Sequence, residues 1–241
     1  MSKLVEGDIE QWAIEQLHGL GYRFVHGPDI EPKSGEALRA YTDVLIASEV
    51  KAAIARLNPE LNQSQCEEVF RTLQNINHGS LIQDNREWHK YLTQGINIEI
   101  QQNGQNKGHL ARLIDFDDVH NNVFWAVNQV TIRQQRHERR PDIVLYINGL
   151  PLVVLELKNA VSENATLQDA FQQIQTYQQD IPSLFTYNAF NIISDGLEAQ
   201  AGTISADFSR YMAWKTANGV YQAKNTQPQL EVLIAGMLGP V

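Results

Sequence analysis

The spacing of apolar residues divides the chain into a helical first part and a strand-rich second part. Up to residue 94, apolar positions recur every three or four residues, as on one face of a helix, and only residues 22–25 indicate a strand. Helices are predicted over about 8–20, 42–57, 64–76 and 80–93, with a loop at 26–42. Asp8 and the pair Ser64 and Glu67 are the expected helix caps. This run of helices predicts a helical layer or cap against a sheet.

Beyond residue 94 the apolar residues alternate with polar ones, which is typical of half-buried strands. Strands are predicted over 95–101, 110–116, 122–132, 191–194 and 210–214, with helices over 165–178 and 229–238. The two strongest runs, 143–147 and 150–157, flank Asn148 and Gly149, a pair that favours a hairpin.

That hairpin carries charges where a core strand should have none. Asp142 precedes its first strand, and Glu156 and Lys158 lie at the end of its second. Runs this apolar suit strands buried on both faces, and a buried charge needs a partner, either another charge or a metal ion. Glu156 and Lys158 are two residues apart, so on a strand they point to the same face.

The register of the hairpin decides which charges meet. A regular two-residue loop would place Asp142 opposite Leu155, whereas one extra residue would pair Asp142 with Glu156 on a shared face. Pro151 has no N–H for the ladder, which favours a longer loop or a bulge. We therefore predict an irregular hairpin with both carboxylates on one face.

Two carboxylates converging at a strand end form an oxygen-rich site suited to Mg²⁺. A Mg²⁺ ion lowers the pKa of a bound water and stabilises charge on a phosphodiester oxygen, and a nearby lysine can orient that water. The pattern thus points to phosphodiester hydrolysis. The alternative is a buried pair of Lys158 with a carboxylate that only fixes the register of the hairpin.

Other polar residues could join this site. Glu10 on the first helix could add a third carboxylate, or be a solvated acid favoured by the helix dipole. Gln173 and Tyr177 lie four residues apart at the edge of the apolar stripe of the helix 165–178. They would face inward near the site if that helix packs across the hairpin, or otherwise simply close the edge of the core.

Composition narrows the classes of function. The chain has 241 residues, 43% of them hydrophobic, and a net charge of −9, so its surface as a whole does not favour nucleic acid. A DNA contact would need a local basic patch, for which Arg136, Arg139 and Arg140, with Arg133 nearby, are the candidates. The alternative reading of these arginines is a solvated connection.

Several kinds of site are not indicated. Cys66 is the only cysteine, and the histidines show no metal-ligand spacing, so neither a disulfide framework nor a zinc site is predicted. There is no P-loop and no nucleophile elbow. No signal peptide and no apolar run of about 20 residues is visible, so we expect a soluble, cytoplasmic protein with no membrane partner.

Several ordered motifs resemble the N-terminal nuclease region of the R (restriction) subunit of type I restriction-modification enzymes. They are residues 139–145 (RRPDIVL), 148–152 (NGLPL), 156–159 (ELKN), 171–177 (FQQIQTY), 191–196 (NIISDG), and the stretch from 202–204 (GTI) to 214–216 (WKT). The resemblance covers most of residues 120–241 and is weaker but compatible before residue 118.

The resemblance implies an α/β fold of the PD-(D/E)xK nuclease type, a mixed sheet flanked by helices. It implies that Asp142 and Glu156 bind Mg²⁺ and that Lys158 positions or activates the attacking water. Gln173 and Tyr177 match a Gln-x-x-x-Tyr motif thought to support such a site and contact DNA. Glu10 matches an acidic residue that sometimes completes it.

The resemblance also implies that DNA cleavage and ATP-driven translocation belong to different domains of an R subunit. Residues 1–241 would be one endonuclease domain: mostly helical to about 94, a sheet core with the catalytic hairpin over 95–200, and a segment over 201–241 leading to motor domains. Full R subunits continue into two ATP-dependent motor domains and a region that docks on the modification (M) and specificity (S) subunits, and neither is found in this sequence. The expected activity is cleavage of unmodified double-stranded DNA after ATP-driven translocation by the parent. The alternatives are a stand-alone nuclease and a catalytically idle docking module.

Overall fold

A computed structural model describes residues 6–102, 105–158, 166–224 and 226–239. Its centre is a six-stranded sheet of order β1-β4-β7-β8-β9-β10. The strands are β1 (Arg23–His26), β4 (Phe124–Asn128), β7 (Ile143–Ile147), β8 (Leu150–Leu157), β9 (Phe190–Ser194) and β10 (Ala199–Gly202). β1 runs parallel to β4 and β8 runs parallel to β9, and the other neighbours are antiparallel. The sheet is therefore mixed, as predicted.

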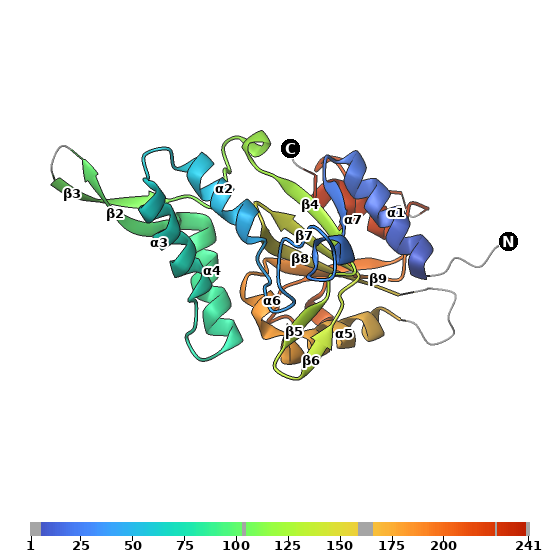
Figure 1. Cartoon of the computed structure of the whole chain (residues 1–241). Helices are drawn as coiled ribbons and strands as arrows, with labels where there is room; N and C mark the ends of the chain where they lie inside the picture. The colour runs from blue at the N-terminus through green and yellow to red at the C-terminus, as the bar shows by residue number, and fades with distance from the viewer. Residues whose placement is uncertain (1–5, 103–104, 159–165, 225, 240–241) are drawn as a thin grey trace.

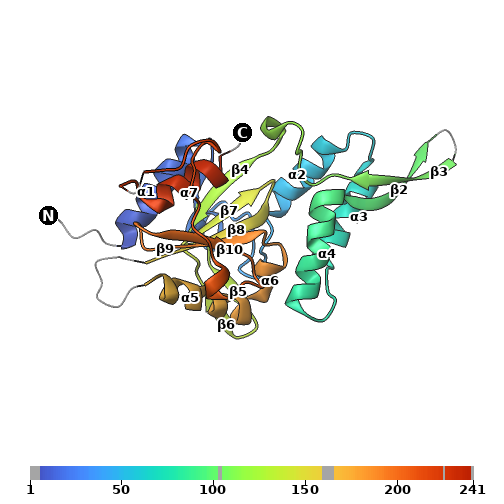
Figure 2. The ribbon, with the colours of Figure 1, turned by 180° about the vertical axis from the view of Figure 1, so that it is seen from behind.

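Helices cover both faces of this sheet (Figures 1 and 2). α1 (Glu6–Gly19) and α7 (Gln229–Met237) pack together on one face, and α5 (Leu167–Asp180) and α6 (Pro182–Thr186) lie on the other. Every residue of β8 is buried, as expected of a strand that is covered on both faces. The helix stripe predicted for α5 is confirmed, because Leu167, Ala170, Phe171 and Ile174 are all buried.

A separate lobe lies beside the sheet (Figure 1). It contains α2 (Ala47–Leu57), α3 (Gln63–Gln74) and α4 (Leu81–Gln94), with the hairpin of β2 (Ile96–Gln102) and β3 (Gln105–Ala111) projecting farthest from the centre. A second hairpin, of β5 (Ile132–Gln134) and β6 (His137–Arg139), lies next to α5. Short 3-10 turns complete the described elements at Gly27–Ile30, Val119–Asn121 and Phe208–Arg210. None of the helices in the described ranges is long and apolar enough to span a bilayer.

The helix predicted over 42–57 begins later than expected, at Ala47. Val44, Leu45 and Ile46 are three consecutive buried residues, which a single helix face could not bury together. The main-chain N–H of Ile46 donates a hydrogen bond to Gly149 O at 3.0 Å, so this non-helical segment packs on the turn of the central hairpin.

The N-cap of α3 is Asn62 rather than Ser64. The Asn62 side chain accepts from the main chain of Gln65, and the Gln65 side chain accepts from the main chain of Asn62. Ser64 and Glu67 therefore lie inside the helix, and the expected capping box is wrong by two residues.

The strand predictions are partly wrong for local reasons. The strand predicted over 122–132 is divided into β4 and β5, because Gln129 has a φ of 52°, a left-handed conformation that ends the ladder. The return strand after β2 is β3, not residues 110–116, since β2 and β3 pair from Ile96–Ala111 out to Gln102–Gln105. Of the strand predicted over 210–214, one bridge between Ala201 and Met212 is present. β6, β10 and α6 had no prediction.

Of the two irregularities that Pro151 favoured, a longer loop or a bulge, the central hairpin has the bulge. Asn148 and Gly149 have φ values of 53° and 79°, which make the tight two-residue turn that such a pair favours. Tyr146 pairs with Pro151, but Leu145 then pairs with Val153, so Leu152 is an extra, bulged residue. The predicted irregularity is confirmed, and it shifts the rest of the register by one position.

A buried ion pair ties the loop before α2 to the start of β5. Arg39 and Glu31 lie with their nearest side-chain atoms 3.7 Å apart, and their side chains are 0% and 6% exposed. Arg39 also donates to Thr131 O and Asp43 O, while Glu31 accepts from the main-chain N–H of Thr131. Each charge is thus satisfied by its partner and by the main chain.

Glu31→Ala should strongly destabilise the fold. It would leave the Arg39 guanidinium buried without its carboxylate, and removing one partner of a buried pair costs about 3–5 kcal/mol. Glu138→Ala is the matched control, because Glu138 pairs with Arg133 where both side chains are about half exposed. Urea unfolding should show a large loss for the first variant and less than about 1 kcal/mol for the second; equal losses would contradict a structural role for the buried pair.

Candidate active site

The shifted register brings the two predicted carboxylates together. Ile143 pairs with Leu155, so extending the ladder by one position places Asp142 opposite Glu156. Asp142 Oδ2 accepts a hydrogen bond of 2.7 Å from the main-chain N–H of Leu157, which fixes its side chain against the end of β8. The Glu156 side chain is only 3% exposed.

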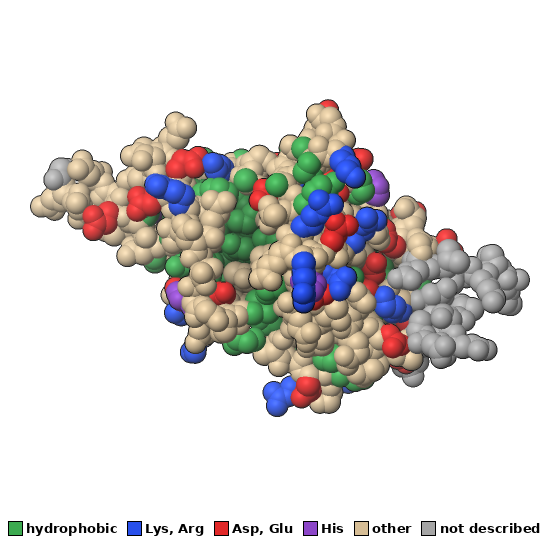
Figure 3. All heavy atoms as spheres, turned by 60° about the horizontal axis from the view of Figure 1, so that its bottom comes forward, with side chains coloured by type: hydrophobic (Ala, Val, Ile, Leu, Met, Phe, Trp, Pro, Cys, Tyr) green, Lys and Arg blue, Asp and Glu red, His purple; other side chains and the backbone are tan. Residues whose placement is uncertain are grey.

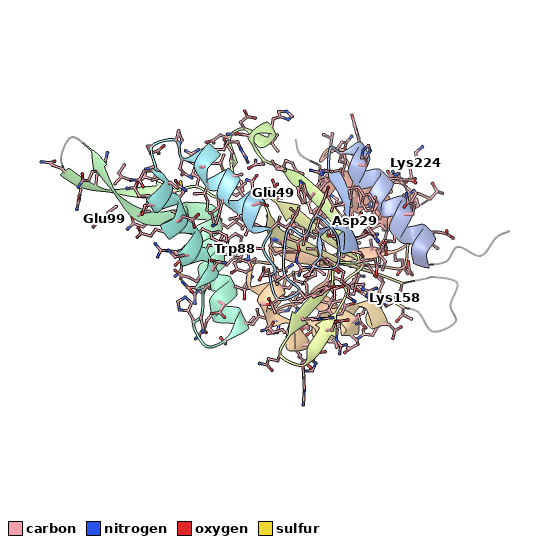
Figure 4. The ribbon with its side chains drawn as sticks, viewed as in Figure 1. Asp29, Glu49, Trp88, Glu99, Lys158 and Lys224 are labelled. Atoms are coloured by element: carbon pink, nitrogen blue, oxygen red, sulfur yellow. The ribbon has the colours of Figure 1, made fainter. Side chains whose placement is uncertain are left out.

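Lys158 completes the predicted group. Its Nζ lies 2.6 Å from Glu156 Oε1, and its side chain is 20% exposed. Its main-chain N–H donates to Ser194 O on β9, so the last residue of the hairpin stays attached to the sheet. Figure 4 shows Lys158 on the side of the fold away from the α2–α4 lobe.

The surroundings of Glu156 disfavour the ionised form of its carboxyl group. Burial raises the pKa of Glu156 to about 8, and the nearby charge of Asp142 adds to that rise, while Lys158 opposes it. One ammonium group therefore does not fully offset two adjacent carboxylates in a desolvated position. Within the described residues, Glu156 Oε2 is buried and makes no hydrogen bond of normal geometry, although the Tyr177 hydroxyl is close enough to lower the pKa of the carboxyl.

These residues fit a divalent metal ion. A hard cation would neutralise the excess negative charge of Asp142 and Glu156 and give the unpaired Oε2 a partner. Among the described residues, no three His, Cys, Asp or Glu side chains gather closely enough to hold a metal ion. The pair would therefore supply two protein ligands, and Mg²⁺ commonly keeps several waters beside one or two carboxylates.

Tyr177 and Gln173 come to the site from α5. Thr166 and Asp169 form a capping box that starts this helix, and Tyr177, three turns later, is only 4% exposed. Burial and the negative charges of Glu156 and Asp142 raise the Tyr177 pKa far above its ordinary value, so its hydroxyl remains a proton donor. Gln173 is half-buried, and its side chain is close enough to that hydroxyl to oppose part of the rise in the Tyr177 pKa. The expectation that both face inward is met.

Glu10 is held apart from the pair. Its two carboxylate oxygens accept from the side-chain amides of Asn128 (2.7 Å) and Gln129 (2.6 Å). His26 in turn contacts Asn128 Oδ1 at 2.9 Å, and the main-chain N–H of Gln129 donates to Asp142 O. Glu10 therefore approaches the site through Gln129 and does not form a three-carboxylate cluster with Asp142 and Glu156.

Sequence reasoning missed His26, Asn128 and Gln129, which lie where β1 and β4 end. The only signal was the pair of amides that follows the apolar run 123–127. Amides in that position are common turn residues, so nothing in the sequence distinguished them.

The predicted arginine patch is divided by ion pairs. Arg133 pairs with Glu138 and stacks on Tyr41, and Arg139 binds Asp180. Arg136, at the turn of the β5–β6 hairpin, and Arg140 are exposed, and their guanidinium groups show no ion pair within the described part of the chain. Figure 3, which brings forward the side where β5 and β6 lie, shows Lys and Arg side chains gathered at the centre with acidic side chains among them.

Comparison with known proteins identifies a family. The model for the N terminus of the type I restriction enzyme R protein matches residues 3–210. The Haemophilus influenzae type I restriction enzyme HindI endonuclease subunit is 38% identical over 241 residues, covering 98% of this chain and 23% of the relative. A Methanocaldococcus jannaschii protein, named provisionally as the type I restriction enzyme MjaIXP endonuclease subunit, is 30% identical over 95% of this chain and 24% of its own length. The chain thus spans about a quarter of these relatives.

Glu156→Gln should change how stability depends on pH. The folded-state pKa of Glu156, about 8, is higher than the ordinary 4.5 of an unfolded chain. The folded state therefore binds more protons between these values, and the free energy of unfolding must fall as pH rises through that window. The neutral glutamine removes this fall and should make the variant more stable above pH 8, by on the order of 1–2 kcal/mol.

Urea unfolding in EDTA between pH 5 and 9 would measure this difference. The exposed substitution Glu36→Gln should follow the wild-type curve. Parallel curves for wild type and Glu156→Gln would show that the Glu156 carboxyl titrates normally.

Proposed function

Because this chain belongs to the family of type I restriction enzyme R protein N termini, we propose that it is a Mg²⁺-dependent endonuclease domain that hydrolyses phosphodiester bonds of double-stranded DNA. The observation that supports this most is the convergence of Asp142, Glu156 and Lys158 at one end of a buried hairpin. A scaffold would gain nothing from two facing carboxylates of which one, Glu156, has a raised pKa, whereas a metal-dependent nuclease needs such a pair.

Asp142 and Glu156 would hold the metal ion. Bound there, Mg²⁺ would supply a water of lowered pKa and stabilise charge on a phosphodiester oxygen. The main-chain N–H of Leu157 keeps Asp142 in place, so this ligand is oriented before any metal arrives. With its raised pKa, the Glu156 carboxyl would lose any bound proton when it held a cation.

Lys158 would orient the attacking water. Its ammonium group is partly exposed at the edge of the site and is directed to it by Glu156. It carries three donors, enough to contact both the carboxylate and a water or phosphate oxygen. Tyr177 keeps its proton, so it would stand beside Glu156 as a neutral group, with Gln173 close to the same hydroxyl.

DNA would contact this side through Arg136 and Arg140. Arg140 precedes the site by two residues, so a phosphate bound there would lie near the carboxylate pair. Arg139 contributes less than the sequence predicted, because Asp180 engages it. Glu10 would act beside the site, through Gln129, and not as a third ligand held with Asp142 and Glu156.

The role in a larger enzyme is part of the same proposal. The two relatives described above are endonuclease subunits of which this chain spans 23% and 24%. We propose that cleavage follows ATP-driven translocation by further parts of such a subunit and that specificity comes from M and S subunits. The pairing of Arg133 and Arg139 with acids favours this reading over a stand-alone nuclease, since few free cations remain to capture DNA.

Lys158→Ala should abolish cleavage without affecting the motor. The test uses the full-length subunit reconstituted with M and S subunits on supercoiled DNA with Mg²⁺ and ATP. Cleavage should fall roughly 100-fold or more while ATP hydrolysis persists, because the lysine belongs to the cleavage site and the motor is a separate part of the subunit. The exposed Lys215→Ala is the matched control and should cleave normally. Persistent cleavage by Lys158→Ala would place the cutting residues elsewhere.

Tyr177→Phe should reduce cleavage more than stability. The hydroxyl makes only a long bond of 3.4 Å to Arg140 O, so its removal should change the free energy of unfolding by less than about 1 kcal/mol. Tyr22→Phe is a matched control, because Tyr22 is equally buried and bonds Leu238 O at 3.2 Å far from the carboxylates. Tyr22→Phe should leave cleavage unchanged; a large drop in melting temperature for Tyr177→Phe alone would make that hydroxyl structural.

A further inference from the structure

An acidic residue ends α5 where a helix least favours one. Asp180 is the last residue of this helix, and the partial negative charge of a helix C-terminus disfavours a carboxylate there. Both of its oxygens are nevertheless engaged. Oδ2 accepts from Arg139 Nε at 2.8 Å, and Oδ1 lies 3.1 Å from His137 Nδ1. The Asp180 side chain is 15% exposed, so the contact is largely enclosed.

These contacts hold a hairpin that is weak by itself. β5 and β6 have three residues each, and a two-stranded ribbon of that length is not stable alone. Two hydrogen bonds help to fix its first strand: the main-chain N–H of Arg133 donates to Tyr41 O, and the main-chain N–H of Ser183 donates to the side-chain Oε1 of Gln134. β6, the strand that leads into Asp142, is held on α5 by the side chain of Asp180.

The same helix also holds the chain between the hairpin and the site. One turn before Asp180, the Tyr177 hydroxyl donates to Arg140 O, and Tyr177 also faces Glu156. α5 therefore fastens residues 137–142 at two levels, at β6 and immediately before Asp142. The exposed Arg140 belongs to this segment, and the exposed Arg136 lies immediately before it, in the turn between β5 and β6.

We propose that Asp180 is a positioning residue that holds the β5–β6 hairpin on α5, so that phosphates bound by Arg136 and Arg140 align with Asp142 and Glu156. This rests on the proposed nuclease function and adds to it the means by which DNA is placed. It also gives Arg139 a structural role as the ion-pair partner of Asp180, in place of the DNA contact that its position in the sequence suggested.

Electrostatics alone makes the opposite prediction. Removing any acid beside a DNA-binding surface raises the local positive charge and should tighten binding. Asp180→Asn keeps the shape of the side chain but loses the charge that holds Arg139. If Asp180 positions the hairpin, this variant should bind DNA more weakly despite its higher positive charge, so the sign of the change separates the two explanations.

The experiment compares Asp180→Asn with Glu138→Gln in the full chain. Glu138 is the other acid paired with an arginine of this hairpin, so both variants lose one negative charge there. Binding to a fluorescein-labelled duplex would be followed by anisotropy in EDTA and 50 mM salt. Asp180→Asn should raise the Kd roughly threefold or more and speed hydrogen exchange over 132–140. Glu138→Gln should bind equally or more tightly.

Exchanging the two charges tests the Arg139–Asp180 ion pair directly. Arg139→Asp and Asp180→Arg should each weaken binding, and the double variant should restore both affinity and slow exchange, because the pair is rebuilt with its charges exchanged. No recovery in a folded double variant would mean that Arg139 itself contacts DNA and would overturn the proposal, as would tighter binding by Asp180→Asn. A wild-type chain that does not bind the duplex at all would also overturn it. Binding is measured in EDTA, where no cleavage occurs, so a wrong assignment of the cutting residues would not alter this result. The exposed Lys215→Ala, which lies outside the site, should keep wild-type affinity.

Discussion

The site depends on one extra residue in β8. Without the bulge at Leu152, the tight turn at Asn148 and Gly149 would set Asp142 against Leu155, and Glu156 would face away from it. The bulge persists because its polar groups are used: Leu152 O accepts from the main-chain N–H of Ala189 and from the Asn188 side chain. Pro151 has no N–H to donate to the ladder, so interrupting the regular pairing beside it sacrifices fewer hydrogen bonds than an interruption elsewhere in the strand. The packing of a loop before β9 thus determines which charges meet at the far end of the hairpin.

Bringing Asp142 and Glu156 together creates a conflict that the fold only partly resolves. Lys158 and the main-chain N–H of Leu157 offset some of the negative charge, yet the Glu156 pKa still rises to about 8. A core optimised for stability would replace such a group with apolar side chains of similar volume. The unfavourable electrostatic energy is therefore concentrated at the end of β8. The buried Arg39–Glu31 pair shows that the same fold can fully satisfy a buried charge elsewhere. Under the proposed function, the unresolved charge is the driving force for binding a cation.

What the sequence predicted correctly was determined by local patterns. The hairpin followed from Asn148 and Gly149, and its irregularity followed from Pro151, because turn type and a missing N–H act over a few residues. The inward position of Tyr177 followed from helical periodicity. The errors arose where distant contacts decide: α2 starts late because residues 44–46 pack against Gly149, and the three-residue strands β5 and β6 are too short to show alternation. The amides that hold Glu10 were invisible for the same reason, since Glu10 and Gln129 are far apart in sequence.

The distribution of charge constrains how such a domain could meet DNA. The chain carries a net charge of −9, and two of the four arginines that the sequence groups before Asp142 are neutralised by neighbours: Arg133 by Glu138 and Arg139 by Asp180. Long-range attraction to a polyanion depends on net charge, whereas local contact depends on a few unpaired cations close to the reacting phosphate. The negative net charge of this chain gives little long-range attraction to DNA. Among the described residues, Arg136 and Arg140 supply the unpaired cations for local contact. A domain built in this way would hold DNA in register once another part of the enzyme had brought it there, and it would avoid binding DNA elsewhere. Under the proposed function, weak capture combined with a well-positioned hairpin restricts cutting to DNA that has been delivered.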